Sequence, residues 1–384
     1  MKILFVCYED MAGYGGGKRQ VLEIAKALSR SGNEIKVRAP FMGSFQSFDG
    51  FDTEYVRTIN MPVLKYFSYL ILSPFYFIKN LFKFRPDIVL FFEVYLDFWP
   101  VFLSKIFKKP LIIYVNGIAA DELGLTGRNP LYIFLVSIFQ KMCLRLANKV
   151  FVVTKVLKNN LVKRFAIEDD KIDIVKNGVD VDLFKPSDVK EAKIRLNFST
   201  NDFLVGFVGG LFPWHGLDLL IESSPLILEQ IPNVKFVIVG QGQMKDKLIQ
   251  QVKAKSLDEA FIFSGAVPFK DIALYINAFD VCAVFFKSVR LDPGDPIKLY
   301  EYLACGKPVV ASNVEGYGDF VEDIGAGISV DANNKKEVSE AIIKLIRDET
   351  LRKDMGRRGR EFVVRNCTWV LRAGQIEESL RQVI

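Results

Sequence analysis

Short apolar runs alternate along the chain with longer segments in which apolar residues recur at helical spacing. Most of the short runs are continuously apolar, which is typical of strands covered on both faces. Regular alternation of strand and helix predicts βαβ units and parallel sheets. The expected strands are Ile3–Cys7, Glu34–Arg38, Ile88–Phe92, Leu111–Val115, Val150–Thr154, Phe203–Val208, Val234–Val239, Phe261–Ser264, Val281–Phe285, Pro308–Ala311 and Gly327–Val330.

The two halves of the chain begin in the same way, with a buried strand, a glycine-rich turn and a helix. This pattern predicts an α/β protein with two Rossmann-like domains, whose mostly parallel sheets face a central cleft. We expect the first domain at residues 1–185 and the second at 186–367, with a hinge formed by Asn177-Gly178 and the polar stretch Lys185–Ala192. A helical tail over residues 368–384 is expected to pack back on the first domain.

Composition narrows the class of protein. Half of the 384 residues are apolar, which suits two cores, and the formal net charge of +6 suits an anionic partner such as a nucleotide or acidic lipid. Five scattered cysteines and a single histidine argue against a zinc site and favour a reducing, cytoplasmic compartment.

No targeting or membrane-spanning segment is expected. The apolar run at the N-terminus is too short for a signal peptide and fits a buried strand. The longest apolar stretch, Tyr66–Ile78, is interrupted by Ser73-Pro74 and falls short of the ~20 residues that cross a bilayer.

The first glycine cluster fits neither common nucleotide fingerprint. A GxGxxG motif starting at Gly13 would need glycine at Lys18, and a Walker motif would need glycine at Ala12 and a hydroxyl at Arg19. These mismatches disfavour NAD-dependent oxidation and P-loop hydrolysis. A glycine-rich turn remains, in which Gly15 and Gly16 would let an anion approach a helix N-terminus; the alternative is a tight turn without a ligand.

The second half has two similar turns. Gly209-Gly210 follows a strand, and the only histidine, His215, stands just before a helix start, where it could donate to a phosphate. A structural role is the alternative for this histidine. Gly240 follows the next strand.

A lysine and a glutamate three residues apart form the strongest chemical signal. Gly294 and Pro296 predict a turn into a helix, on which Lys298 and Glu301 project from one face. The lysine could meet a diphosphate, and the carboxylate could accept both hydroxyls of a ribose. A surface ion pair is the alternative interpretation.

Several motifs occur in the order found in glycosyltransferase family 4, which the chain resembles over essentially its whole length. They are Gly32-Asn-Glu-Ile-Lys-Val37 after the early glycine turn, Asn177-Gly-Val-Asp180, Trp214-His-Gly216, Val239-Gly-x-Gly242 and the run from Pro296 through Lys298, Glu301, Gly306 and Pro308. The Trp-His-Gly loop is similar to that of a subset of the family.

The resemblance implies a GT-B fold, with the acceptor on the first domain and a UDP- or GDP-sugar on the second. It implies hexose transfer to a glycan or lipid-linked acceptor, as in cell-surface polysaccharide or glycolipid synthesis, with retention of configuration and without a metal or other cofactor. Glu301 would hold the ribose, and amides of residues 294–297 would face the diphosphate. The implied donor-binding set is Gly15, Gly16, Gly209, Gly210, His215, Gly240, Gly294, Asp295, Ile297, Lys298, Leu299 and Glu301.

The chain departs from the family pattern at three places. Pro293 stands where many relatives have a first glutamate, for which Asp292 or Asp295 could substitute. Gly210 and His215 stand where many relatives have a basic pair, which leaves the phosphates to His215 and Lys298.

Asn116 replaces a frequent histidine, and Glu122 follows shortly after it. Asn116 could hydrogen-bond the sugar or acceptor, and Glu122 could orient or deprotonate the acceptor hydroxyl. Glu122 could instead only begin a helix. The implied catalytic set is Asn116, Glu122, His215 and Lys298.

Residues 57–85 interleave basic and aromatic side chains and contain no acidic residue. This composition favours contact with an anionic membrane surface over nucleic acid, because the stretch is nearly continuously apolar. A buried helix pair is the alternative, and the apolar segment Leu131–Phe139 is expected in the core.

Two other functions remain open at this point. One is a sugar-nucleotide epimerase of the same fold, and the other is a non-catalytic nucleotide- or carbohydrate-binding protein.

Overall fold

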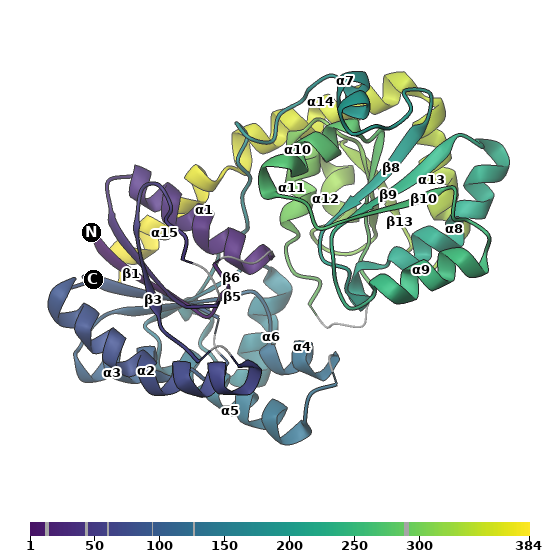
Figure 1. Ribbon diagram of the computed structural model, residues 1–384. Helices are drawn as coiled ribbons and strands as arrows, with labels where there is room; N and C mark the ends of the chain where they lie inside the picture. The colour runs from purple at the N-terminus through teal and green to yellow at the C-terminus, as the bar shows by residue number, and fades with distance from the viewer. Residues whose placement is uncertain (12–14, 43–44, 60, 94, 126, 288–291) are drawn as a thin grey trace. The chain divides into compact units, whose positions relative to one another are not determined.

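A computed structural model of the chain describes residues 1–11, 15–42, 45–59, 61–93, 95–125, 127–287 and 292–384 (Figure 1). The chain divides into two compact units, one of residues 1–177 with 369–384 and one of residues 178–368. The chain therefore first passes from one unit to the other between residues 177 and 178, eight residues before the expected 185/186 boundary. Near the two places where the chain passes between the units, Val179 forms a parallel β-bridge with Thr368.

The first unit is built on a seven-stranded sheet of order β3-β2-β1-β4-β5-β6-β7, in which each strand pairs in parallel with its neighbours. Its strands are β1 (Lys2–Cys7), β2 (Glu34–Pro40), β3 (Asp52–Val56), β4 (Ile88–Phe92), β5 (Leu111–Val115), β6 (Lys149–Val152) and β7 (Ile172–Ile174). Its helices are α1 (Gly16–Arg30), α2 (Pro62–Lys83), α3 (Trp99–Ile106), α4 (Ala119–Leu125), α5 (Pro130–Leu146), α6 (Lys155–Phe165) and α15 (Trp369–Arg381).

Helices cover both faces of this sheet, with α1 and α15 on one side and α2, α3 and α5 on the other (Figure 1). The central strands β4 and β5 are buried at every position, as continuously apolar strands between two helical layers must be. The C-terminal helix α15 packs on α1 and so belongs to the first unit.

The second unit has a six-stranded sheet of order β10-β9-β8-β11-β12-β13, again with parallel pairings. Its strands are β8 (Phe203–Val208), β9 (Val234–Val239), β10 (Phe261–Gly265), β11 (Val281–Val284), β12 (Val309–Ser312) and β13 (Gly327–Val330). Its helices are α7 (Val189–Arg195), α8 (Leu217–Gln230), α9 (Lys245–Ala254), α10 (Phe269–Ala278), α11 (Ile297–Ala304), α12 (Gly318–Asp323), α13 (Lys335–Arg347) and α14 (Glu349–Asn366).

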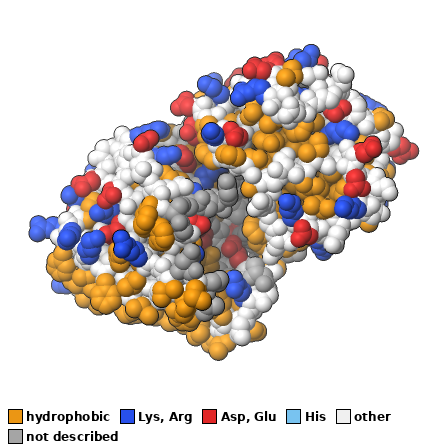
Figure 2. Space-filling view, viewed as in Figure 1, with side chains coloured by type: hydrophobic (Ala, Val, Ile, Leu, Met, Phe, Trp, Pro, Cys, Tyr) orange, Lys and Arg blue, Asp and Glu red, His pale blue; other side chains and the backbone are white. Residues whose placement is uncertain are grey.

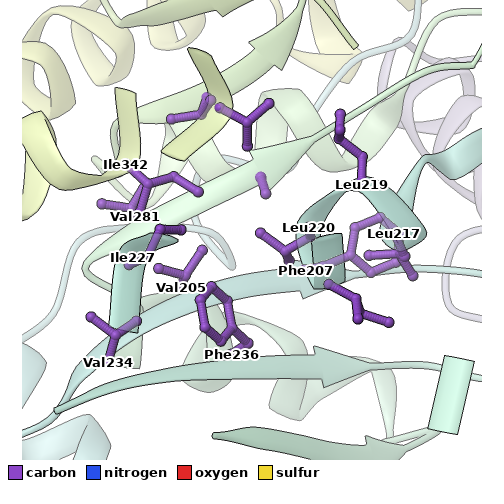
Figure 3. Close-up of a cluster of buried hydrophobic side chains, with 14 of the residues drawn as sticks. Val205, Phe207, Leu217, Leu219, Leu220, Ile227, Val234, Phe236, Val281 and Ile342 are labelled. Atoms are coloured by element: carbon purple, nitrogen blue, oxygen red, sulfur yellow. The ribbon is translucent and has the colours of Figure 1, made fainter. Parts of the chain in front are cut away.

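Alternate residues of its strands enter two separate cores. Val205, Phe207 and Phe236 point into the cluster shared with α8 and α13, part of which Figure 3 shows. Their neighbours Leu204 and Val208 point into the cluster on the other face. The period of two along a strand and apolar residues at every position together explain this packing.

Most of the expected strands are confirmed, and five agree to the residue. These are Ile88–Phe92, Leu111–Val115, Phe203–Val208, Val234–Val239 and Gly327–Val330. The sequence analysis missed β3 and β7, which lie at the two edges of the first sheet. The sequence of β3, Asp-Thr-Glu-Tyr-Val, alternates with polar residues, and β7 has three residues only, so neither gives a buried-strand signal.

Helix α2 continues through Pro74, although the sequence treats Ser73-Pro74 as an interruption. The buried guanidinium of Arg38 donates to the Ser73 carbonyl at 2.7 Å and to its hydroxyl at 3.0 Å. These bonds satisfy polar groups in the helix turn that the proline distorts. No helix among the described residues combines the length and apolarity needed to cross a bilayer.

One packing prediction is wrong. The segment Leu131–Phe139 belongs to α5, but Leu131, Phe134 and Ile138 are 65%, 61% and 46% exposed. Helix α5 is apolar on most of its surface, and a core can cover only one side of it. The five cysteines are all buried, and none forms a disulfide.

Candidate active site

The strand order of the second sheet reverses between β8 and β11, and the turns at their carboxyl ends bring the candidate residues together. Ligands of open parallel sheets bind at such a reversal. The turn after β8 carries Gly209 and Gly210, and α11 carries Lys298 and Glu301.

Close backbone approach explains the glycines of these turns. The Gly209 amide donates to the Val239 carbonyl at 2.9 Å, and a Cβ on Gly240 would stand 1.9 Å from the Gly209 carbonyl oxygen. Both glycines have positive φ, 146° and 141°. Gly240 therefore has a structural reason to be glycine, independent of any ligand.

Lys298 lies directly against the glycine turn. A Cβ on Gly209 would come within 2.6 Å of its ammonium nitrogen, which lies 4.1 Å from the centroid of the Phe207 ring. Desolvation lowers the pKa of Lys298 to about 7, although the nearby Glu301 carboxylate acts in the opposite direction. The absence of a side chain at Gly209 thus leaves room for the half-buried Lys298. A nearby anion would favour the protonated form of this lysine.

Glu301 is only 2% exposed and lies one turn further along α11. Its electrostatic effect on Lys298 agrees with the shared helix face that the three-residue spacing predicts. Leu299, between them, is fully buried in the core, so its side chain serves packing.

His215 belongs to a short 3-10 turn, Pro213–His215, just before α8. Its Nδ1 donates to the Gly210 carbonyl at 2.5 Å. Since a carbonyl only accepts, the neutral ring carries its proton on Nδ1, and Nε2 can donate only from the imidazolium. The rings of Phe212 and Trp214 contact the imidazole.

The loop before α11 is held by its own aspartates. Asp292 accepts from the Gly294 amide at 3.0 Å, and Asp295 accepts from the Tyr300 hydroxyl at 2.6 Å. Gly294 has a φ of 74°, and Ile297 is the first residue of α11. Both carboxylates therefore shape the loop, which is a reason for their presence besides contact with a sugar.

In the first unit, a carboxyl group faces the start of α1. A Cβ on Gly17 would lie 2.5 Å from a Glu9 carboxyl oxygen, and the Lys18 backbone hydrogen-bonds the same group. Burial raises the pKa of Glu9 to about 7. Gly15 and Gly16 open this helix, and residues 12–14 lie outside the described chain. A carboxyl group of the protein itself thus lies at this helix N-terminus.

Asn116 and Glu122 lie near each other at the carboxyl edge of the first sheet. Asn116 donates to the Gln20 amide oxygen at 2.7 Å, and Glu122 lies in α4. Both face Glu93, at the end of β4, whose pKa burial and the charges of Glu122 and Glu9 raise to about 8. The sequence analysis missed Glu9 and Glu93; a carboxylate one or two residues after a buried strand is the signal that could have identified them.

Comparisons with known proteins agree with this architecture. A model described as Glycosyltransferase Family 4 matches residues 14–183, and one described as Glycosyl transferases group 1 matches residues 188–362. An uncharacterized glycosyltransferase of Methanocaldococcus jannaschii is 28% identical over 374 residues, covering 92% of each chain. A GDP-mannose-dependent phosphatidylinositol monomannoside mannosyltransferase of Mycolicibacterium smegmatis is 28% identical over 53% of this chain and 54% of its own.

Two solved structures share the fold. Sucrose-phosphate synthase of Thermosynechococcus elongatus has a TM-score of 0.84 at 20% identity, covering 99% of this chain and 98% of its own. HepE of Anabaena, solved with UDP-glucose, has a TM-score of 0.78 at 20% identity and covers all of both chains.

The two parallel-sheet units and these matches define a glycosyltransferase of GT-B fold. The chain belongs to the enzymes that join a Family 4 first domain to a group 1 second domain. This class favours the transferase over the epimerase and over the non-catalytic binding protein.

Proposed function

We propose that the protein transfers a hexose from a UDP- or GDP-sugar to a glycan or lipid-linked acceptor, with retention of configuration and without a metal ion. The observation that carries this proposal is Lys298, half-buried against Gly209 at the β8/β11 reversal with its pKa lowered to about 7. A buried cation at a glycine turn suits a diphosphate, whose charge would restore the protonated lysine.

The surrounding residues are assigned to the same donor. The Glu301 carboxylate would accept the ribose hydroxyls, and amides of residues 294–297 would donate to the diphosphate at the start of α11. His215, held by Gly210, would donate from Nε2 as an imidazolium. These donors would stabilise the negative charge that develops on the leaving diphosphate.

Relatives support the kind of donor and acceptor. HepE is solved with UDP and with UDP-glucose, and the mannosyltransferase of M. smegmatis is named as GDP-mannose-dependent, with a phosphatidylinositol mannoside acceptor. Because uridine and guanosine nucleotides both occur among these proteins, we propose either a UDP-sugar or a GDP-sugar as the donor. The name of the mannosyltransferase supports a lipid-linked acceptor, and a capsular polysaccharide biosynthesis glycosyltransferase of Staphylococcus aureus among the relatives supports a glycan acceptor.

A thermal-shift series with UDP, GDP, UDP-glucose and GDP-mannose tests the donor assignment. A ligand at 100 times its dissociation constant stabilises the folded chain by about 2.7 kcal/mol, which is a measurable rise in Tm. The Glu301→Ala variant is expected to lose most of the rise produced by the best nucleotide. The control is Glu340→Ala, which removes an exposed carboxylate from a surface pair on α13. Equal rises in both variants would refute the ribose assignment.

Two further measurements test the mechanism. Proton NMR of the product should show the anomeric configuration of the donor sugar, and an inverted product would rule out retention. Transfer should persist in EDTA; a loss restored by a divalent cation would rule out the metal-free mechanism.

We also propose that the first unit rests on an anionic membrane surface. The α2 apolar face, consisting of Leu64, Phe67, Ile71, Phe75 and Phe82, is 44–67% exposed at helical spacing. Hydrophobic side chains gather along α2, α3 and α5 (Figure 2). Lys65, Lys83 and Arg85 supply nearby positive charge, whereas Lys79 is engaged by Glu54 at 2.6 Å.

Flotation with liposomes of phosphatidylglycerol and of phosphatidylcholine tests this contact. Phe67→Ser with Phe75→Ser is expected to weaken binding to the anionic liposomes at least tenfold. Ile194→Ser, at an equally exposed apolar position in α7, is the matched control. The membrane proposal fails if the double variant and the control bind alike.

A further inference from the structure

A small crevice opens among the first-unit residues that follow β4 and β5. Its lining consists of Glu93, Tyr95, Gly117, Ala119, Glu122 and Gln140, and its volume is about 10 Å³. A space of this size holds one water-sized group. The crevice is therefore scaled to a single hydroxyl group and not to a whole sugar ring.

The walls of the crevice are fixed by paired groups. The Gln140 side chain accepts from the Ala119 amide at 3.1 Å and donates to the Gly117 carbonyl at 3.2 Å. Asp121 accepts two bonds from Arg164, at 2.6 and 2.8 Å, which anchors α4 and hence Glu122. Two carboxyl groups thus reach the crevice from separately anchored elements.

Glu93 is held in an uncommon conformation. Its φ is 56°, while its amide donates to the Tyr114 carbonyl at 2.9 Å and its carboxyl accepts from the Tyr95 hydroxyl at 3.3 Å. A left-handed glutamate costs backbone energy, which is common where a side chain must be aimed at a site.

A buried amide beside the carboxyl cluster offers hydrogen bonds that the protein does not use. Gln20 is 1% exposed, and its amide oxygen accepts from Asn116. Its amide nitrogen and the Asn116 side-chain oxygen have no hydrogen-bond partner among the described residues. Since such groups are costly to bury, this pair points to a polar ligand.

We propose that Glu93 is an acceptor-binding residue, and that its carboxyl and that of Glu122 hold one hydroxyl of the acceptor between them. The inference rests on the proposed transferase function and assigns this hydroxyl site to the first unit. Asn116 stands where many relatives have a histidine and cannot titrate. Glu93 thereby supplies a titrating group at this site.

The neutral form of Glu93 binds the hydroxyl. Glu122 and Glu9 face Glu93 with like charge, and Tyr95 and Asn116 face it with hydrogen bonds. Near neutral pH the protonated Glu93 carboxyl donates to the hydroxyl, while the Glu122 carboxyl accepts from it. Above about pH 8 Glu93 is ionised and the donor is lost.

The probes are the methyl α-glycosides of glucose, mannose, galactose and N-acetylglucosamine, followed by saturation-transfer NMR from pH 6 to pH 9. Affinity of the best probe is expected to fall about tenfold between pH 7 and pH 9, as required for one proton with a pKa near 8. Glu93→Gln should keep the binding at pH 7 and lose its pH dependence, whereas Glu93→Ala should lose the binding.

The control is Glu168→Gln, which removes an exposed carboxylate elsewhere in the same unit. Carboxyl ¹³C NMR should show a glutamate titrating near pH 8 that is absent from Glu93→Gln. The proposal is overturned if the wild type binds none of the four probes, if Glu93→Gln weakens binding as Glu93→Ala does, or if its pH dependence persists. Nucleotide thermal shifts should be equal in wild type and Glu93→Gln; absent shifts in both would instead refute the donor assignment.

Discussion

The two sheets have the same strand order around their first strand, but different ionisable groups lie at their carboxyl edges. In the second unit the turn after β8 meets the Lys298 ammonium group. In the first unit the turn after β1 leads to the Glu9 carboxyl, with Glu93 and Glu122 close by. In our proposals, the same local geometry serves an anion site in one unit and a hydroxyl site in the other.

This contrast shows that a glycine turn before a helix does not by itself define a phosphate site. The helix dipole and free amides favour negative charge at both turns. In the first unit the Glu9 carboxyl group already lies at this helix start. The turn of the second unit instead receives the Lys298 side chain from α11, and the pKa of this lysine is lowered because its ammonium group is poorly solvated.

The largest expected effect is on stability, and it concerns Arg38, the cation of the first unit that we compare with Lys298 of the second. Arg38 is fully buried, donates twice to Ser73 and lies 3.7 Å from Asp97. Arg38→Met leaves a buried carboxylate without its cation, and we expect a loss of about 3–5 kcal/mol in the free energy of unfolding of the first unit. Urea denaturation followed by circular dichroism measures it. Lys253→Met, at an exposed site, is the control; a loss below 1 kcal/mol would show that Asp97 is satisfied without Arg38.

Lys298→Met is expected to act on activity and not on stability. If Lys298 faces the leaving diphosphate, as we propose, removing its positive group should lower kcat by about 10²–10³-fold. Because the poorly solvated ammonium is costly in the free protein, Tm should stay the same or rise. Steady-state kinetics with the best donor, with Lys253→Met alongside, separate the two effects. Activity within threefold of wild type would remove Lys298 from the donor site.

The carboxyl cluster should weaken the fold as pH rises. The pKa of Glu93 is raised from 4.5 to about 8, so the folded chain keeps a proton that the unfolded chain releases. Stability therefore falls between these values and levels off above pH 8. Relative to wild type, Glu93→Gln should gain about 1–3 kcal/mol between pH 5 and pH 9. Thermal unfolding at both pH values measures this; a constant difference would contradict the raised pKa.

The smallest effect concerns the pH dependence of nucleotide binding. With a pKa of about 7, Lys298 is partly neutral in the free protein and must take up a proton to meet a diphosphate. The dissociation constant of the best nucleotide should therefore rise up to about tenfold per pH unit above pH 7. Calorimetry in buffers of different ionisation enthalpy measures the proton uptake. If Lys298→Met keeps the same pH profile, another group is responsible.

The amino-acid sequence by itself determined the α/β class, most strands and the pairing of Lys298 with Glu301, because these features depend on local spacing. A buried strand is apolar at every position, and residues three apart on a helix share a face. The edge strands β3 and β7 could not be predicted in this way, because a half-covered strand or a strand of three residues is not continuously apolar over enough positions.

Only the tertiary structure decided which side chains meet. Glu9 and Glu93 are 84 residues apart but follow β1 and β4, which become neighbours when the sheet forms. The exposure of α5 and the capture of Lys79 by Glu54 likewise depend on which surfaces remain uncovered. Strand order and burial arise from long-range packing, and the charge at the edge of each sheet follows from them.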